Sequence, residues 1–162
     1  MAHKISILIG SKSDYPVIEK GFETLKEFGI KFDVNVTSAH RSLKNTVQLA
    51  EKLHKSGTEI FIVGAGMAAH LPGVVAAAVP CPVIGVPIGP GTMAGLDSVL
   101  SIVQMPPGIP VAAVAVNGIV NAVLLAVQMF SLTDEKLNKQ FVEYKNNLAE
   151  KVQKDNFSIQ NH

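Results

Sequence analysis

The chain has 162 residues, a length that suits one domain spanning 1–162 with a single core, and its formal net charge of +1 gives no electrostatic support for nucleic-acid binding. Its one cysteine, Cys81, excludes an intramolecular disulfide framework and a cysteine-rich metal site. The N-terminus runs into an apolar stretch without a signal-peptide pattern, so we expect a cytoplasmic protein.

Strand-like and helix-like segments alternate along the chain. Short apolar runs predict strands over 5–9, 32–36, 59–63, 82–86 and 110–116. Apolar residues at helical spacing predict helices over 18–28, 42–56, 68–79, 97–104 and 119–129, of which the first two end at Gly29 and Gly57. Strands that alternate with helices of this length indicate right-handed βαβ units. The predicted fold class is therefore α/β, with a parallel five-stranded sheet between two helical layers.

The second half of this pattern is almost free of charge. From Ile60 to Thr133 only Asp97 carries a formal charge, so most of this segment must be buried. Within it, 111–130 is uncharged and about as long as the ~20 residues of a membrane span. Asn117 interrupts that stretch, however, and no basic flank marks a cytoplasmic side. We therefore expect no membrane span but burial against other copies of the chain, which predicts a homo-oligomer.

An amphipathic helix over 133–155 follows the five-strand unit. Thr133 is a plausible N-cap, and Asp134 and Glu135 stand in the first turn, where the helix dipole favours negative charge. The apolar stripe of this helix consists of Leu137, Phe141, Tyr144, Leu148 and Val152. The stripe could pack on the chain's own domain, but the five-strand unit looks complete without it. We therefore expect the stripe to pack on a neighbouring subunit.

Three polar motifs follow predicted strands, and in an open parallel sheet ligands bind outside the carboxyl ends of the strands. The first motif is Gly10–Asp14. Ser11 and Ser13 offer hydroxyl groups, and the N-terminus of the following helix can bind an anion. Asp14 either caps that helix or accepts hydrogen bonds from the hydroxyls of a ribose. The glycine spacing fits neither a P-loop nor a dinucleotide-binding fingerprint.

The second motif, Ser38–Arg41, contains the protein's only arginine. Arg41 can bind a phosphate through two parallel hydrogen bonds, although a surface ion pair with a carboxylate is an alternative. A histidine side chain such as that of His40 can both accept and donate a proton in one reaction cycle near neutral pH. The two side chains together favour catalysis on a phosphorylated substrate over a structural role.

The third motif, Gly64–Gly73, is rich in small residues, which let the backbone approach a ligand closely and can exclude water. Within it, His70 could contact substrate or donate to a buried backbone carbonyl. The other histidines, His3, His54 and His162, have no comparable context. No group of histidines and carboxylates has the spacing of a metal site, so no metal is expected.

Six ordered motifs resemble the N5-carboxyaminoimidazole ribonucleotide mutases in sequence and spacing. They are Gly10–Asp14, Ser38–Arg41, Ala65–Gly73, Pro82–Pro87, Gly95–Ser98 and Ser101–Pro106, and the resemblance continues through Asn121–Ala126. It implies a flavodoxin-like three-layer sandwich with an extra C-terminal helix, assembled as a homo-octamer with active sites at subunit junctions. It also implies transfer of a carboxylate from the exocyclic nitrogen of N5-carboxyaminoimidazole ribonucleotide to C4, giving 4-carboxy-5-aminoimidazole ribonucleotide, without a cofactor.

The resemblance assigns roles to ten residues. His40 would be the general acid and base of the reaction. The substrate-binding set would be Ser11, Asp14 and Arg41 on the ribonucleotide, Ser13 beside them, and Ser38, Ala65, Gly66, His70 and Leu71 lining the pocket. One histidine can give the leaving nitrogen its proton and later take the C4 proton, provided that a dry pocket retains the carbon dioxide.

The sequence departs from the family pattern at two places, and two functions other than a mutase were considered. After Arg41 the family usually continues Thr-Pro, whereas this chain has Ser42, which can still cap the second helix, and the loop 88–93 is unusually rich in glycine. Related carboxylases, which take free carbon dioxide and aminoimidazole ribonucleotide, tend to carry lysine at the position of Arg41 and to lack the Ala-His-Leu-Pro-Gly run; this sequence sides with the mutases. A non-catalytic nucleotide- or flavin-binding module is disfavoured by an aromatic content of only 6%.

Overall fold

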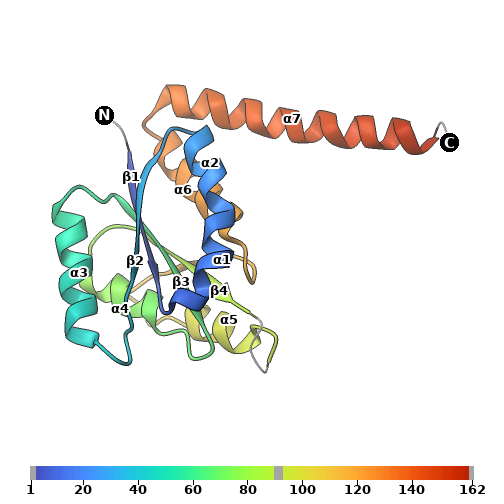
Figure 1. The fold of residues 1–162 in the computed structure, drawn as a ribbon. Coiled ribbons are helices and arrows are strands. Elements are labelled where there is room, and N and C mark those ends of the chain that lie inside the picture. Colours follow the sequence, from blue (N-terminus) through green and yellow to red (C-terminus); the bar gives the residue numbers. More distant parts are fainter. Residues whose placement is uncertain (1–2, 90–92, 161–162) are drawn as a thin grey trace. The chain divides into compact units, whose positions relative to one another are not determined.

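The computed structural model describes residues 3–89 and 93–160 (Figure 1). The chain divides into two compact units, Met1–Ala126 and Val127–His162. The first unit contains the whole sheet, and the second contains the long C-terminal helix.

The first unit is built on a parallel five-stranded sheet. Its strands are β1 (Lys4–Ile9), β2 (Lys31–Val36), β3 (Ile60–Gly66), β4 (Val83–Ile88) and β5 (Ala112–Ala113), in the order β2-β1-β3-β4-β5. The central strands are buried on both faces: Ile5 through Ile9 and Ile60 through Val63 are shielded from solvent. Continuous apolar runs form such strands because both faces of a parallel sheet are covered by helices. The predicted parallel sheet is confirmed.

Helices cover both faces of the sheet (Figure 1). On one face lie α3 (Leu43–Lys55), α4 (Leu71–Ala78) and α5 (Leu96–Val103), which contribute Ala50, Val75 and Ile102 to a core cluster with β1, β3 and β4. On the other face lie α1 (Tyr15–Ile18), α2 (Phe22–Glu27) and the part of α6 (Ile119–Ser131) that belongs to the first unit. The expected flavodoxin-like three-layer arrangement is confirmed.

The first predicted helix, 18–28, is broken into short pieces. The chain passes through a 3-10 turn η1 (Lys12–Asp14), α1, a second 3-10 turn η2 (Glu19–Gly21) and then α2. Gly21 lies at the break and packs against α6, since a Cβ at this position would come within 2.8 Å of Ile119 Cγ1. The predicted helix is therefore interrupted at the point where this segment packs closely against α6.

The fifth strand is much shorter than the predicted 110–116. Only Ala112 and Ala113 pair with β4, although the Val114 amide still donates to the Gly85 carbonyl at 3.3 Å. Pro110 has no amide proton and cannot contribute a ladder bond, so pairing begins only after it. The apolar sequence alone overstates the length of this edge strand.

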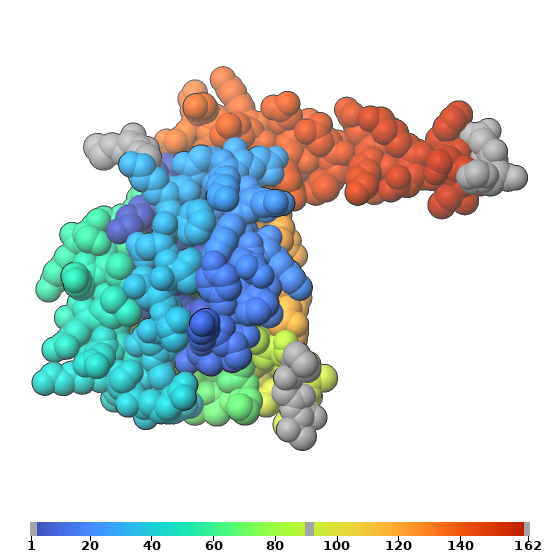
Figure 2. Space-filling model, in the orientation of Figure 1, coloured from blue at the N-terminus to red at the C-terminus, as the bar shows by residue number. Residues whose placement is uncertain are grey.

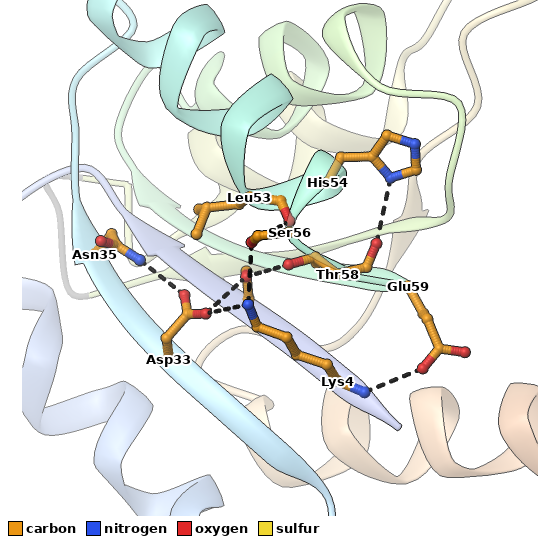
Figure 3. Close-up of polar contacts among 9 residues, drawn as sticks. Lys4, Asp33, Asn35, Leu53, His54, Ser56, Thr58 and Glu59 are labelled. Carbon is orange, nitrogen blue, oxygen red and sulfur yellow. Dashed lines mark hydrogen bonds and ion pairs between the residues drawn. The ribbon is translucent and has the colours of Figure 1, made fainter. Parts of the chain in front are cut away.

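A network of polar side chains connects the strands near their amino ends (Figure 3). The fully buried Ser6 hydroxyl of β1 lies 2.7 Å from Thr58 Oγ1 and 3.1 Å from Asp33 Oδ2 of β2. Lys4 Nζ lies 3.4 Å from Asp33 and donates to Ser56 at 3.2 Å. The network joins β1, β2 and the turn that leads from α3 into β3.

The second unit contains α7 (Glu135–Gln160), longer than the predicted 133–155. Asp134 caps it, because Asp134 Oδ1 accepts a hydrogen bond from the Leu137 amide at 3.0 Å, so the predicted cap at Thr133 is one residue early. Every residue from 145 to 160 is exposed. Across the residues that the structure describes, no helix combines the length and the apolarity needed to cross a membrane.

Candidate active site

The loops that leave the carboxyl ends of β1, β2 and β3 surround one pocket of about 640 Å³. Figure 2 shows the segments after these strands, in dark blue, cyan and green, gathered at the lower edge of the first unit. All ten residues predicted for the site line this pocket: Ser11, Ser13, Asp14, Ser38, His40, Arg41, Ala65, Gly66, His70 and Leu71. Parallel strands bring their carboxyl ends to one edge, which is why motifs far apart in the sequence meet here.

The first loop is shaped by its own side chains. Ser11 accepts a hydrogen bond from the Ser13 amide at 3.3 Å, while Asp14 Oδ2 accepts one from the Ser11 amide at 3.1 Å, which is a capping box. Asp14 thus stabilises the turn from its third position, where Ser11 is the N-cap, and its side chain does not cap α1, which was one of the two predicted alternatives. Its other oxygen, Oδ1, lies 3.5 Å from the Ser13 hydroxyl and can accept further hydrogen bonds.

Partial burial affects the acidity of Asp14. Desolvation raises the pKa of this carboxyl above its ordinary value of 3.8, and the hydrogen bonds from Ser11 and Ser13 oppose that rise. A carboxylate that is incompletely hydrated gains more from new hydrogen-bond donors than one in open water. The position suits recognition of hydroxyl groups.

The second loop holds Arg41 by hydrogen bonds to uncharged groups. Arg41 Nε donates to Ser38 Oγ at 3.3 Å, and Arg41 Nη2 donates to the Gly10 carbonyl at 3.2 Å. No carboxylate among residues 3–89 and 93–160 forms an ion pair with it, which rules against the predicted alternative of a surface ion pair. The guanidinium charge is thus available to an anion in the pocket.

The end of β2 is fixed to α3 just before this loop. The buried Thr37 and Thr46 hydroxyls lie 2.7 Å apart and join the last residue before Ser38 to the first turn of α3. Ser42 occupies the N-cap position as expected, but its hydroxyl donates to the Ser38 carbonyl rather than capping the helix.

The third loop places His70 against His40. His40 Nε2 lies 2.8 Å from His70 Nδ1, and the rings meet edge to face with centroids 4.9 Å apart. Neither of the two predicted alternatives, substrate contact or a bond to a buried carbonyl, anticipated this pairing. This pairing could not be predicted from the sequence, because the two residues belong to different motifs, 30 positions apart.

Sequence reasoning assigned no role to five further lining residues: Gly10, Ala39, Met67, Ala68 and Ile88. Four of them flank predicted residues, and their proximity could have been inferred from the motifs. Ile88 comes from the end of β4, and the glycine-rich loop 88–93 lies partly outside the described residues.

The other predicted features lie away from the pocket. His54 contacts the Thr58 carbonyl at 3.3 Å, and His3 pairs with Glu59 at the amino edge, while His162 falls outside the described residues. Within the described ranges, no three His, Cys, Asp or Glu side chains are grouped so that they could hold a metal ion.

Known proteins share this sequence and fold. A family model described as AIR carboxylase matches residues 4–151. An N5-carboxyaminoimidazole ribonucleotide mutase of Mycobacterium tuberculosis is 47% identical over 149 residues, covering 92% of this chain and 86% of the relative. A chloroplastic phosphoribosylaminoimidazole carboxylase of Vigna aconitifolia is 42% identical over 98% of this chain, which spans 28% of that longer protein.

The fold comparison agrees with the sequence comparison. The crystal structure of a Treponema denticola PurE2 variant superposes with a TM-score of 0.90 at 31% identity, covering 98% of each chain. A match of this extent includes all three strand-end loops and the sheet that positions them. The chain belongs to the AIR carboxylase family.

Proposed function

We propose that this protein is a mutase that converts N5-carboxyaminoimidazole ribonucleotide to 4-carboxy-5-aminoimidazole ribonucleotide. The observation that carries the proposal is the meeting, in one pocket, of a histidine pair and an arginine that forms no ion pair with any described carboxylate. The mutase name of a relative that is 47% identical over most of the chain supports the same reaction.

The ribonucleotide would be held by the first two loops. Arg41 binds the phosphate, because its charge is not neutralised and a guanidinium offers two parallel donors. Ser11 and Ser13 add hydroxyl donors, and Asp14 accepts hydrogen bonds from the ribose hydroxyls through Oδ1. Ser38 orients the guanidinium, and the wall of Ala65, Gly66 and Leu71 faces the imidazole.

His40 carries the proton transfers. It donates a proton to the exocyclic nitrogen as the bond from that nitrogen to the carboxylate carbon breaks, which releases carbon dioxide within the pocket. C4 of the electron-rich aminoimidazole then forms a bond to the same carbon. The C4 proton returns to His40, so the enzyme ends the cycle in its starting protonation state and no external acid, base or nucleotide triphosphate is consumed.

His70 acts as a positioning residue for His40. A hydrogen bond of 2.8 Å between two ring nitrogens requires one ring to donate and the other to accept, so the tautomers of the two rings are linked. The bond also fixes the rotation of the His40 ring. Both effects keep His40 ready for transfer in either direction.

Turnover of N5-carboxyaminoimidazole ribonucleotide by purified protein, without added ATP or metal, tests the proposal. We expect product formation with the natural chain and its loss in His40→Asn, with binding of the ribonucleotide largely retained. Normal turnover by the Asn variant would refute the role of His40. No turnover by the natural chain would refute the mutase assignment.

The alternative is direct carboxylation of aminoimidazole ribonucleotide by carbon dioxide, and the carboxylase name of the plant relative favours it. Supplying each substrate separately distinguishes the two. A mutase converts the N-carboxylated substrate in bicarbonate-free buffer, whereas a carboxylase requires aminoimidazole ribonucleotide together with bicarbonate.

We also propose that the whole chain, 1–162, works as one PurE-like domain in a cytoplasmic homo-octamer. The helix predicted over 133–155 would pack on a neighbouring subunit. Large apolar side chains support an assembly: on α5, Leu96, Leu100 and Val103 are about half exposed, and on α7, Leu148 and Val152 are exposed. Single-chain folds rarely leave so many apolar residues in water unless they form contacts with other chains.

A further inference from the structure

Met67 adopts a backbone conformation that its side chain disfavours. Its φ is +54°, in the left-handed region, where a bulky residue is uncommon. The residue before it, Gly66, lies so close to β4 that a Cβ would come within 3.1 Å of the Ile88 carbonyl oxygen. The end of β3 therefore turns sharply, and Met67 stands in the strained position of that turn. Such strain persists where the surrounding structure fixes it, often at functional sites.

The Met67 side chain is not buried in the hydrophobic core, so core packing does not offset this strain. It is 66% exposed, whereas its close neighbours Ala69 and Leu71 are 1% and 3% exposed. Burial of apolar surface thus does not explain a long apolar side chain at a strained position. It lines the pocket that also contains His40 and His70.

Met67 differs from the other large apolar residues of the pocket. Leu71 and Ile88 are 3% and 9% exposed, so both belong to the fixed wall. Met67 is long, unbranched and unconfined by packing, which allows it to change rotamer and cover a ligand after that ligand has entered. The pocket thus has a rigid apolar wall at Leu71 and Ile88 and an adaptable, largely exposed apolar side chain at Met67.

We propose that Met67 covers the reacting centre and retains carbon dioxide between the two halves of the reaction. This inference rests on the proposed mutase function. Once the nitrogen-to-carbon bond has broken and His40 has given its proton, carbon dioxide is a neutral, uncharged molecule that no ion pair can hold. Only a closed apolar surface keeps it next to C4 until the new carbon–carbon bond forms.

Retention of isotope in the product tests this role. N5-carboxyaminoimidazole ribonucleotide labelled in its carboxylate is converted in buffer with unlabelled bicarbonate, and the labelled fraction of the product and the yield of aminoimidazole ribonucleotide are measured. We expect the natural chain and Met67→Leu to retain the label. Met67→Gln, of similar length but polar, and Met67→Ala should lose label and release aminoimidazole ribonucleotide severalfold more often.

Met67→Gly separates the side chain from the backbone. Glycine relieves the left-handed strain, so the melting temperature should equal or exceed that of the natural chain while the label is lost as in Met67→Ala. If Met67→Gly loses label but is at least as stable as the natural chain, poor folding cannot be the cause of the loss.

Three outcomes would overturn the proposal. Full label retention by Met67→Gln and Met67→Ala would show that the side chain does not confine carbon dioxide. A change in molar mass by light scattering in those variants would show that Met67 is instead a contact between subunits. Failure of the natural chain to convert the substrate at all would remove the mutase function, and this inference with it, and is recognised before any variant is made.

Discussion

Arg41 is positioned before any ligand arrives, because Ser38 and the Gly10 carbonyl accept hydrogen bonds from its guanidinium. A lysine keeps the charge but cannot make both bonds and still present a planar pair of donors. We expect Arg41→Lys to raise KM for the ribonucleotide by about 10- to 100-fold, the equivalent of one charge-assisted hydrogen bond of about 1.5–3 kcal/mol, with a smaller effect on kcat. Steady-state kinetics check this, and Lys44→Arg, two residues into α3, is a matched control. Equal KM values for Arg41→Lys and the natural chain would contradict phosphate binding by Arg41.

Asp14 makes stability depend on pH. Because burial raises the pKa of Asp14 above 3.8 in the folded protein, the folded state binds this proton more tightly than the unfolded state. Stability therefore falls as pH rises from about 3.8 through the raised value, and the loss persists at neutral pH. Asp14→Asn removes the charge, while its Oδ1 can still accept from the Ser11 amide.

We expect the melting temperature of Asp14→Asn to exceed that of the natural chain at pH 7, with the difference shrinking as pH approaches 4. Thermal unfolding at a series of pH values checks the trend, and turnover by the same variant should fall because a ribose acceptor is lost. A temperature difference that does not change with pH would show that desolvation of this carboxylate is not its cause.

His70 should matter for rate more than for binding. Removing the partner of His40 frees the ring to rotate and uncouples its tautomer, as happens when a residue that orients a functional histidine is lost. We expect His70→Ala to lower kcat by about 10- to 100-fold with little change in ribonucleotide affinity. An unchanged kcat in His70→Ala would contradict positioning of His40 by His70.

At the scale of elements, the stabilising polar network lies at the amino ends of the strands, whereas the candidate active site lies at their carboxyl ends. Ser6→Ala should destabilise the fold by about 1–3 kcal/mol, because the buried Thr58 hydroxyl and the Asp33 carboxylate each lose a hydrogen-bond partner (Figure 3). Urea denaturation measures the loss. Turnover per folded molecule should be unchanged, since the amino edge is a strand length from the pocket, and a fall in kcat would show that the two edges are coupled.

Most elements could be predicted from the sequence because the apolar pattern and the glycine and proline residues between elements indicate the same boundaries. Strands buried on both faces read as continuous apolar runs, and this pattern located β1, β3 and β4 within a few residues. The first helix and the fifth strand were less predictable, since the break at Gly21 depends on its contact with Ile119 and the length of β5 depends on how few of its residues reach β4. Local sequence does not encode those tertiary contacts.

The site was predictable in membership but not in internal contacts. Strand-end motifs converge in any parallel sheet, so the ten lining residues followed from topology and resemblance together. The pairing of His40 with His70 and the left-handed conformation of Met67 did not follow, because both depend on how separate loops meet. The type and spacing of the residues were enough to identify the members of the site. The contacts among them could be known only from the structure.

At the scale of the whole molecule, α7 tests the proposed assembly. Leu148→Glu with Val152→Glu places two charges on the apolar stripe, and we expect a lower molar mass by light scattering. Asn146→Glu with Gln153→Glu adds the same charge to the opposite face of the helix and should leave the mass unchanged. An equal mass for both double variants and the natural chain would show that the stripe does not contact another subunit.

The capping box at Ser11 and Asp14 has a consequence for how fast substrate is captured. A loop that already satisfies its own amides does not have to become ordered around an arriving phosphate, so little chain entropy is lost on association. Capture should then be governed by diffusion and by the attraction of the guanidinium, and the bimolecular rate constant should decline as ionic strength rises.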